Sequence, residues 1–121
     1  MIVSGGPRPA PTTLTAIFFE VIEKVSVPHA YQYKKGGVYT PITHAQVLER
    51  ARRVSLGLGA IGVKRGDRVG IMSENRPEWA IAYFGILRAG AAAVPVDPQL
   101  SAAELVNLWR TAGAAIALVS D

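Results

Sequence analysis

The stretch that decides the fold spans residues 67–98 and reads DRVGIMSENRPEWAIAYFGILRAGAAAVPVDP. It begins with a short apolar run at 69–72, which the polar segment 73–77 interrupts. From 78 to 89 the apolar residues recur at helical spacing, and a second apolar run follows at 91–96. Two short apolar runs joined by a helix of about three turns predict a βαβ unit with parallel strands. Because neither run alternates apolar with polar residues, we expect both strands to be covered on both faces.

The residues after this unit predict one further helix and one further strand. Ser101 and Glu104 have the spacing of a capping box, and Gly113 is expected to end the helix that they begin. An apolar run at 115–119 then predicts a third strand. The pattern indicates an α/β fold: the N-terminal part of an open, mostly parallel sheet with flanking helices. No helix follows to cover the third strand before Asp121, so we interpret the chain as a truncated piece of a longer domain.

A helix and a β-hairpin are predicted ahead of the sheet. Residues 1–11 hold three prolines and two glycines and read as a flexible leader, which leaves 12–121 as an α/β subdomain. Thr12 or Thr13 can cap the first helix, which ends before Pro28. Its apolar stripe could be core, a dimer contact or a membrane-surface face. The stripe consists of Leu14, Ile17, Phe18, Val21, Ile22 and Val25.

The hairpin and the helix after it are predicted from turn and cap chemistry. Segments 29–34 and 38–42 flank a Lys-Gly-Gly turn, whose glycines allow the positive φ of a tight turn. Thr43 and Gln46 match a capping box, and an apolar stripe from Val47 to Ile61 follows. Residues 57–62 fit the GxGxxG pattern, but they close a helix instead of linking a strand to a helix. We therefore interpret the match as accidental.

Composition excludes several classes of protein. The chain has 121 residues, no cysteine, half hydrophobic residues and 18% charged residues, which argues against disorder, disulfides and thiolate metal sites. The apolar stretch 79–96 is interrupted by Arg88 and Pro95, so no transmembrane segment is expected. The net charge of +4 could indicate a nucleic-acid surface, yet no stacking aromatics accompany the cations, and a solvated helix face is favoured. These cations are Arg50, Arg52, Arg53, Lys64, Arg65 and Arg68.

No catalytic or metal site assembles from the sequence. His29 and His44 are far apart and lack ligand spacing, and neither a GK[ST] loop nor a GxSxG elbow occurs. Asp97 follows a predicted strand, where open α/β sheets bind ligands, although an Asp before Pro is also ordinary turn chemistry. Trp79 and Trp109 lie on apolar helix stripes and are most simply core residues.

One segment carries a resemblance to a known family. Residues 87–98, LRAGAAAVPVDP, resemble the leucine-x-alanine-glycine…proline-x-aspartate motif of the adenylate-forming (AMP-binding) enzymes. The approach to it, 57–87, and the Tyr39-Thr40 pair are similar to the same family. Residues 73–79, SENRPEW, resemble the long-chain fatty acyl-CoA synthetase branch. The resemblance covers 30–121 and identifies the chain as the N-terminal segment of such an enzyme.

The resemblance implies a ligase that acts on a fatty acid with ATP, magnesium and coenzyme A, through an acyl-adenylate. The family's phosphate loop, nucleotide motifs, acyl tunnel and catalytic lysine lie further on, so no catalytic, cofactor-binding or metal-binding residue is assigned here. We expect the segment alone to be inert. Pairing of long-chain members through N-terminal segments makes the first helix a candidate homodimer face. The residues of that face are Leu14, Phe18, Val21, Ile22 and Val25.

Two alternatives stay open. The chain could be a free-standing α/β interaction domain derived from such an enzyme, or a basic nucleic-acid module, which we disfavour. Without a secretory signal in the sequence, a cytoplasmic location is expected, either free or peripheral to a membrane.

Overall fold

The computed structural model describes residues 13–25 and 27–121, so the predicted leader at 1–11 lies outside the described residues. The order of elements confirms the predicted α/β fold, with a helix and a hairpin ahead of a parallel sheet. The elements are α1 (Leu14–Lys24), β1 (Tyr31–Lys35), β2 (Val38–Ile42), α2 (His44–Ala60), β3 (Arg68–Met72), α3 (Pro77–Arg88), β4 (Ala92–Pro95), α4 (Ala102–Ala112) and β5 (Ala114–Val119).

The helix ends follow the predicted cap chemistry. The Thr13 hydroxyl accepts from the Ala16 N–H at 3.0 Å at the start of α1. Both predicted capping boxes are present, with Thr43 and Gln46 at α2 and with Ser101 and Glu104 at α4. Each box satisfies backbone N–H groups that a helix start would otherwise leave without a partner.

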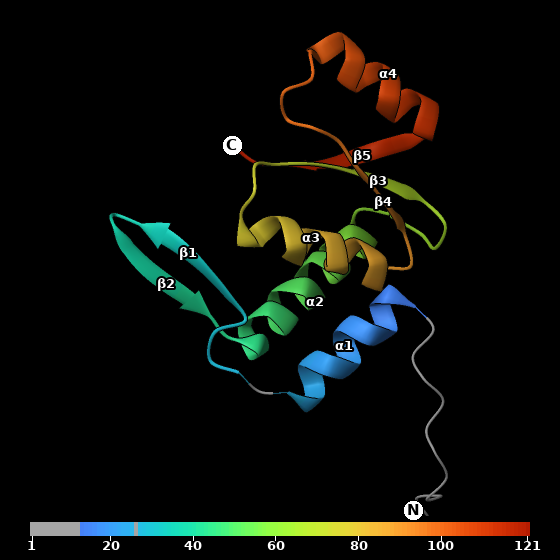
Figure 1. Ribbon diagram of the computed structural model, residues 1–121. Helices are drawn as coiled ribbons and strands as arrows, with labels where there is room; N and C mark the ends of the chain where they lie inside the picture. The colour runs from blue at the N-terminus through green and yellow to red at the C-terminus, as the bar shows by residue number, and fades with distance from the viewer. Residues whose placement is uncertain (1–12, 26) are drawn as a thin grey trace, which may run out of the picture.

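The helices form layers on both sides of a three-stranded parallel sheet with the order β4-β3-β5. Figure 1 shows α4 on one side of this sheet and α3, α2 and α1 on the other. The chain therefore runs from β3 to a neighbour on one side, and then crosses to a neighbour on the other side. This is the start of a doubly wound arrangement.

The two strands of the βαβ unit are buried to different degrees. Val69, Gly70 and Ile71 of the central strand β3 are fully buried, as predicted. Strand β4 lies at the edge, with its first and last residues, Ala92 and Pro95, exposed. The expectation that both strands are covered on both faces was therefore wrong for β4, because an apolar run does not reveal a strand's place in the order.

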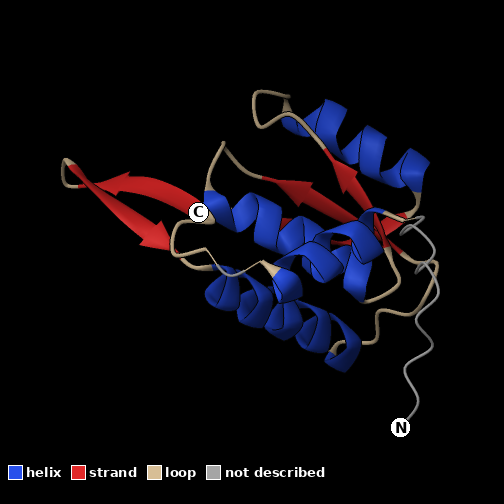
Figure 2. Cartoon of the chain, turned by 60° about the horizontal axis from the view of Figure 1, so that its bottom comes forward, coloured by secondary structure: helices blue, strands red, loops and turns tan. Residues whose placement is uncertain are grey.

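The hairpin β1–β2 pairs in antiparallel register, from Tyr31 with Ile42 to Lys35 with Val38. Gly36 and Gly37 form its turn with φ of 57° and 85°, the left-handed values that favour glycine. The hairpin projects from the helical layers, as Figure 2 shows. It is anchored at its base, where the Ile42 side chain is 1% exposed.

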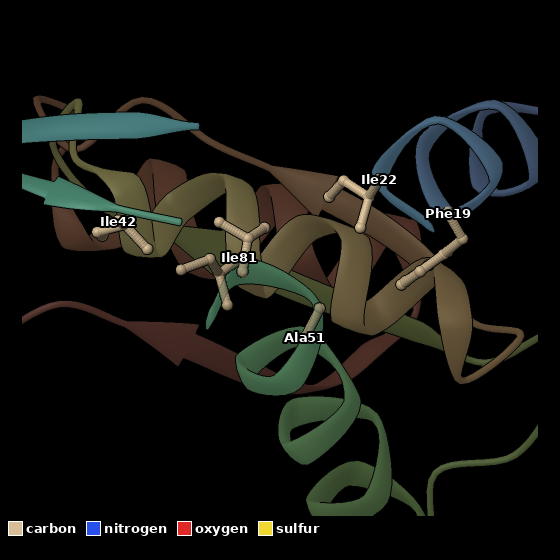
Figure 3. Close-up of a cluster of buried hydrophobic side chains, with 6 residues drawn as sticks. Phe19, Ile22, Ile42, Ala51 and Ile81 are labelled. Atoms are coloured by element: carbon tan, nitrogen blue, oxygen red, sulfur yellow. The ribbon is translucent and has the colours of Figure 1, made fainter. Parts of the chain in front are cut away.

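The buried side chains form two clusters that meet at the crossing of α2 and α3. One cluster joins α1, the hairpin, α2 and α3 (Figure 3), and consists of Phe19, Ile22, Ile42, Val47, Ala51 and Ile81. The other joins helices α2 and α3 to the sheet, and consists of Leu58, Val69, Ile71, Ile86 and Ala91. Val54 packs against both clusters, so this side chain connects them.

Close approach at this crossing depends on Gly85. A Cβ atom added to Gly85 would lie 2.5 Å from Val54 Cγ1 and 3.1 Å from the Ala51 carbonyl oxygen. Real side chains do not tolerate the first distance, so a larger residue at 85 would push α3 away from α2. The glycine therefore sets the spacing of the helical layer.

The apolar stripe of α1 is divided between the core and the surface. Ile22 is 9% exposed in the first cluster, and Phe18 stacks on Phe84 of α3 with ring centroids 3.5 Å apart. Leu14, Val21 and Val25 point outward with Ile17 and are exposed. The homodimer face predicted on this helix stays a prediction, and its residues Leu14, Val21 and Val25 are exposed in this fold.

The buried stripe of α2 ends earlier than expected. Ile61 was predicted on that stripe, but its side chain is 62% exposed. The helix ends at Ala60, and Gly62 follows with φ 95°, so the chain leaves the helical path before Ile61 can reach the core.

We predict that Gly85→Ala lowers the free energy of unfolding by about 1–3 kcal/mol, the usual cost of overpacking. Gly57→Ala in α2 is the matched control, because an added Cβ there meets nothing within 4 Å. The control should be neutral or more stable by up to about 1 kcal/mol, since alanine is the better helix former. Urea denaturation measures both, and equal stabilities of the two variants would contradict the proposed crossing.

Candidate functional site

The strand order places one position of the sheet where open α/β folds usually bind ligands. The chain leaves β3 toward β4 and returns to the other side of β3 as β5, so the order reverses between β3 and β5. Ligands in such sheets bind beyond the carboxyl ends of the strands at this reversal. The candidate site therefore lies after Met72 and Val119.

A pocket of about 220 Å³ occupies this position. Its floor is apolar and comes from the ends of β3 and β5 and the first turns of α3, and its rim is polar. The lining residues are Ile71, Met72, Ser73, Arg76, Glu78, Trp79, Ala82, Leu118, Val119, Ser120 and Asp121.

A chain of hydrogen bonds and ion pairs forms the polar rim. The Ser120 hydroxyl donates to Glu74 Oε2 at 2.7 Å, and the Ser120 N–H donates to the Met72 carbonyl at 3.1 Å. Arg76 then bridges two carboxylates, with Nη1 3.1 Å from Glu74 Oε1 and Nε 3.0 Å from Glu78 Oε2. These contacts tie the β3–α3 loop to the end of β5.

The rim orders the loop, and its hydroxyl–carboxylate pair, Ser120 with Glu74, is poorly suited to nucleophilic catalysis. The hydrogen bond from Ser120 is the main reason why the pKa of Glu74 lies below its ordinary value, and Arg76 adds to the effect. A carboxylate with a lowered pKa is a weak base, so Glu74 is poorly suited to activate Ser120. The pocket is thus suited to binding or packing an apolar group.

Of the residues considered from sequence, Trp79 lines this pocket, whereas Asp97, His29 and His44 do not. Asp97 accepts the Gln99 N–H on Oδ1 at 2.8 Å, which is the turn contact expected of an Asp before Pro. His29 is exposed, and the His44 ring forms a hydrogen bond between Nδ1 and the Val25 carbonyl oxygen. Trp79 packs against the sheet cluster and stacks on Tyr83.

The glycines at 57–62 do not form a nucleotide loop. They lie in the last turns of α2 and just after it, and the Gly62 N–H already donates to the Gly59 carbonyl. Among residues 13–25 and 27–121, no three acidic or histidine side chains form a group that could hold a metal ion. No reaction step is assigned to the residues described here.

Several basic residues have protein partners. Arg53 pairs with Glu49 at 2.8 Å, and Arg52 lies 3.8 Å from Glu23. Arg68 donates from Nε to the Ala112 carbonyl at 3.0 Å, at the end of α4. These contacts are those of a solvated helix face and a helix C-terminus, and absence of nucleic-acid binding stays a prediction.

Sequence reasoning missed the rim residues Ser120, Glu74 and Arg76. A signal was available, because Ser73–Arg76 directly follows the buried strand β3. The sequence did not reveal that β5 lies next to β3. This adjacency brings Ser120 to Glu74, 46 residues away in the sequence.

Most of the chain matches the model of one protein family. Residues 18–121 match the family described as "AMP-binding enzyme", which confirms the resemblance. The chain therefore belongs to the AMP-binding, adenylate-forming enzymes. None of the helices in the part of the chain that the structure describes is long and apolar enough to span a membrane.

Relatives within this family differ in their stated substrates. The chain is 41% identical over 91 residues, 75% of its length, to the long-chain-fatty-acid–CoA ligase FadD15 of Mycobacterium bovis. It is 34% identical over 92% of its length to the long-chain-fatty-acid–CoA ligase heimdall of Drosophila melanogaster. It is also 36% identical over 74% of its length to a feruloyl-CoA synthase of an Amycolatopsis species. The chain spans 15%, 17% and 18% of the length of these three curated relatives.

Similarity also extends to nonribosomal peptide synthetases and to solved structures. The chain is 35% identical over 88% of its length to tyrocidine synthase 3 of Brevibacillus parabrevis, and spans 2% of that protein. The crystal structure of IdnL1 matches with a TM-score of 0.80 over 88% of this chain and 22% of that one, at 24% identity. The nonribosomal peptide synthetase FmoA3 matches with a TM-score of 0.77 over 94% of this chain and 12% of that one, at 30% identity. These structures share the α/β fold described above.

We predict that Ser120→Ala raises the pKa of Glu74 toward its ordinary value, because the hydroxyl bond is the main cause of the lowered pKa. NMR titration of the glutamate side-chain carboxyl carbons measures the change. Glu104 is the internal control, since its pKa is lowered mainly by Ser101 and should not move.

The hydrogen bond between Ser120 and Glu74 makes the stability of the fold depend on pH. Because the pKa of Glu74 is lowered in the folded protein, the bond stabilises the fold above the ordinary pKa, and this stabilisation is lost as the pH falls through the folded value. An unchanged Glu74 titration in Ser120→Ala would contradict the rim geometry.

Proposed function

We propose that this chain is the N-terminal portion of an ATP-dependent long-chain fatty acid–CoA ligase. In the whole enzyme, a fatty acid carboxylate would react with ATP to give an acyl-adenylate and pyrophosphate. The coenzyme A thiol would then displace AMP and form the acyl thioester. Magnesium is the expected counter-ion of the nucleotide.

The observation that carries this proposal is the 41% identity to a long-chain-fatty-acid–CoA ligase over 91 residues. The segment SENRPEW at 73–79, which resembles the same branch, supports it and forms the β3–α3 loop and the start of α3. The feruloyl-CoA synthase and the peptide synthetase at 36% and 35% identity define the competing substrates, an aromatic acid and an amino acid.

In this proposal the described segment contributes architecture and no reacting group. Its sheet begins the doubly wound layer, and its switch-point pocket is closed on one side by the Ser120–Glu74–Arg76 rim. Because we assign no catalytic, cofactor-binding or metal-binding residue to this segment, we expect it alone to lack ATP turnover. We expect the whole enzyme in the cytoplasm, either free or at a membrane surface.

A test uses the full gene product that contains this sequence. AMP release is measured with a long-chain fatty acid, ferulate and a panel of amino acids, each with ATP, magnesium and coenzyme A. We predict that kcat/KM for the fatty acid exceeds the values for the other acids by about tenfold or more. This is the usual degree to which a hydrophobic pocket discriminates between substrates. Preference for ferulate or an amino acid would overturn the substrate assignment.

The 121-residue chain serves as the matched control in the same assay. We expect no AMP release from it, while its circular dichroism shows that it is folded. Turnover by the isolated chain would contradict the inertness that we propose.

A further inference from the structure

The amino end of the parallel sheet is where its three strands begin and where the helices before them end. Helix α2 ends before β3, α3 before β4 and α4 before β5. Figure 1 shows α3 and α4 running in the same direction, so that both end on the side away from the C-terminus of the chain. The amino end consists of residues 61–68, 85–90 and 109–113.

This end carries the net charge of the whole chain. Its segments hold five of the thirteen cationic residues and one of the nine acidic residues. Their net charge of +4 equals that of the chain, so the charges of the remaining residues are balanced. The five cations are Lys64, Arg65, Arg68, Arg88 and Arg110, and the acid is Asp67.

The five cations are exposed, and no ion pair links any of them to a carboxylate of the described residues. The Asp67 carboxylate accepts the Lys64 backbone N–H at 2.7 Å and so closes the turn before β3. Arg68 donates from Nε to the Ala112 carbonyl at 3.0 Å, a favourable contact for a cation at a helix C-terminus. Among residues 13–25 and 27–121, no carboxylate or carbonyl holds the charged groups of Lys64 and Arg65 in this way. These two cations therefore remain available to an anionic partner.

An exposed apolar side chain lies within this basic surface. Ile61 follows α2, and its side chain is 62% exposed because Gly62 turns the chain away from the core. Lys64 and Arg65 follow in the same loop. An apolar side chain beside cations suits the headgroup region of an anionic membrane, where the cations meet lipid phosphates and the apolar group is buried at the acyl boundary.

A nucleic acid would also attract these cations, but the side chains around them do not suit it. The aromatic residues next to Arg110 and Arg88 are turned inward, since Trp109 packs against Gly70 and Phe19 is 7% exposed. They are not available to stack on bases. An exposed isoleucine gains no free energy from contact with phosphates, whereas it does from burial at a membrane boundary.

We propose that the amino end of the sheet docks onto anionic membranes, with Ile61 at the headgroup boundary and the cations of this end on lipid phosphates. The proposal rests on the membrane-surface location given in the proposed function, and it names the surface and the class of lipid. It does not rest on the ligase reaction, so vesicle binding and AMP release test the two independently. The switch-point pocket lies at the opposite end of the strands and would face away from the bilayer.

Vesicle co-sedimentation of the full gene product that contains this sequence tests the proposal. Vesicles of phosphatidylcholine are compared with vesicles of an equal mixture of phosphatidylcholine and phosphatidylglycerol. We expect binding to the anionic vesicles that weakens as salt is added, and little binding to the neutral ones. Absence of binding to the anionic vesicles would overturn the proposal, and so would equal binding to both kinds.

A pair of charge variants locates the contact. Lys64→Gln combined with Arg65→Gln should weaken binding to the anionic vesicles by about tenfold or more, the usual effect of removing two basic residues from such a surface. Lys34→Gln combined with Lys35→Gln is the matched control, because it removes the same charge from exposed residues at the tip of the hairpin. The control should leave binding nearly unchanged.

A pair of apolar variants tests the insertion of Ile61. Ile61→Ser should weaken binding by about fivefold or more, because less apolar surface is buried at the boundary. Val38→Ser is the matched control, since Val38 is 67% exposed on the hairpin, and it should have little effect. Circular dichroism establishes that all variants are folded.

Three other outcomes would overturn the docking surface. Equal losses from the amino-end and hairpin variants would indicate a general attraction to the net charge of the protein. Losses from the hairpin variants alone would assign the membrane contact to the hairpin. Binding of a DNA duplex in preference to the anionic vesicles would assign the cations to nucleic acid.

Discussion

The close crossing of α2 and α3 is the contact on which the rest of this structure depends. Gly85 lets α3 approach until Val54 of α2 occupies the space where a Cβ atom would lie. Val54 packs against both buried clusters, and α3 also covers the central strand through Ile86. If these helices separated, α1 and the hairpin would lose their contacts with the layer that covers the sheet. Packing at one glycine thus couples the N-terminal elements to the sheet.

A second glycine, Gly70, allows a helix to pack closely on the opposite face of the sheet. A Cβ atom on Gly70 of β3 would lie 2.6 Å from the Trp109 ring. The Trp109 side chain of α4 therefore packs directly against the backbone of the central strand. The Trp109 Nε1–H also points to the Val94 carbonyl of β4 at 3.4 Å. Helix α4 nevertheless has no fully buried residue, so this face is covered less completely than the face under α3. The face of the sheet under α2 and α3 is thus more completely buried than the face under α4.

Local chemistry was readable from the sequence, and long-range adjacency was not. The capping boxes at Thr43 and Ser101 were predicted because each depends on residues three apart, and the hairpin because paired glycines define its turn. The strand order was not predicted, because three similar apolar runs do not indicate which of them forms the central strand. The same limit explains why α1 could not be divided into inward and outward residues, and why the switch-point pocket was missed. Asp97 also follows a strand, and its carboxylate accepts the Gln99 N–H of the next turn, a contact between residues two apart that the sequence indicated.

Native-state hydrogen exchange of the 121-residue chain tests most directly whether the α2–α3 crossing is the centre of the fold. The account predicts that the amides of β3 and of α3 around Gly85 exchange slowest and together, because opening them requires the clusters to separate. The amides of the β1–β2 hairpin and of α4 should exchange faster, through local opening. If α4 or the hairpin proved as protected as β3, or if α3 exchanged faster than β3, the crossing would not be the contact on which the fold depends.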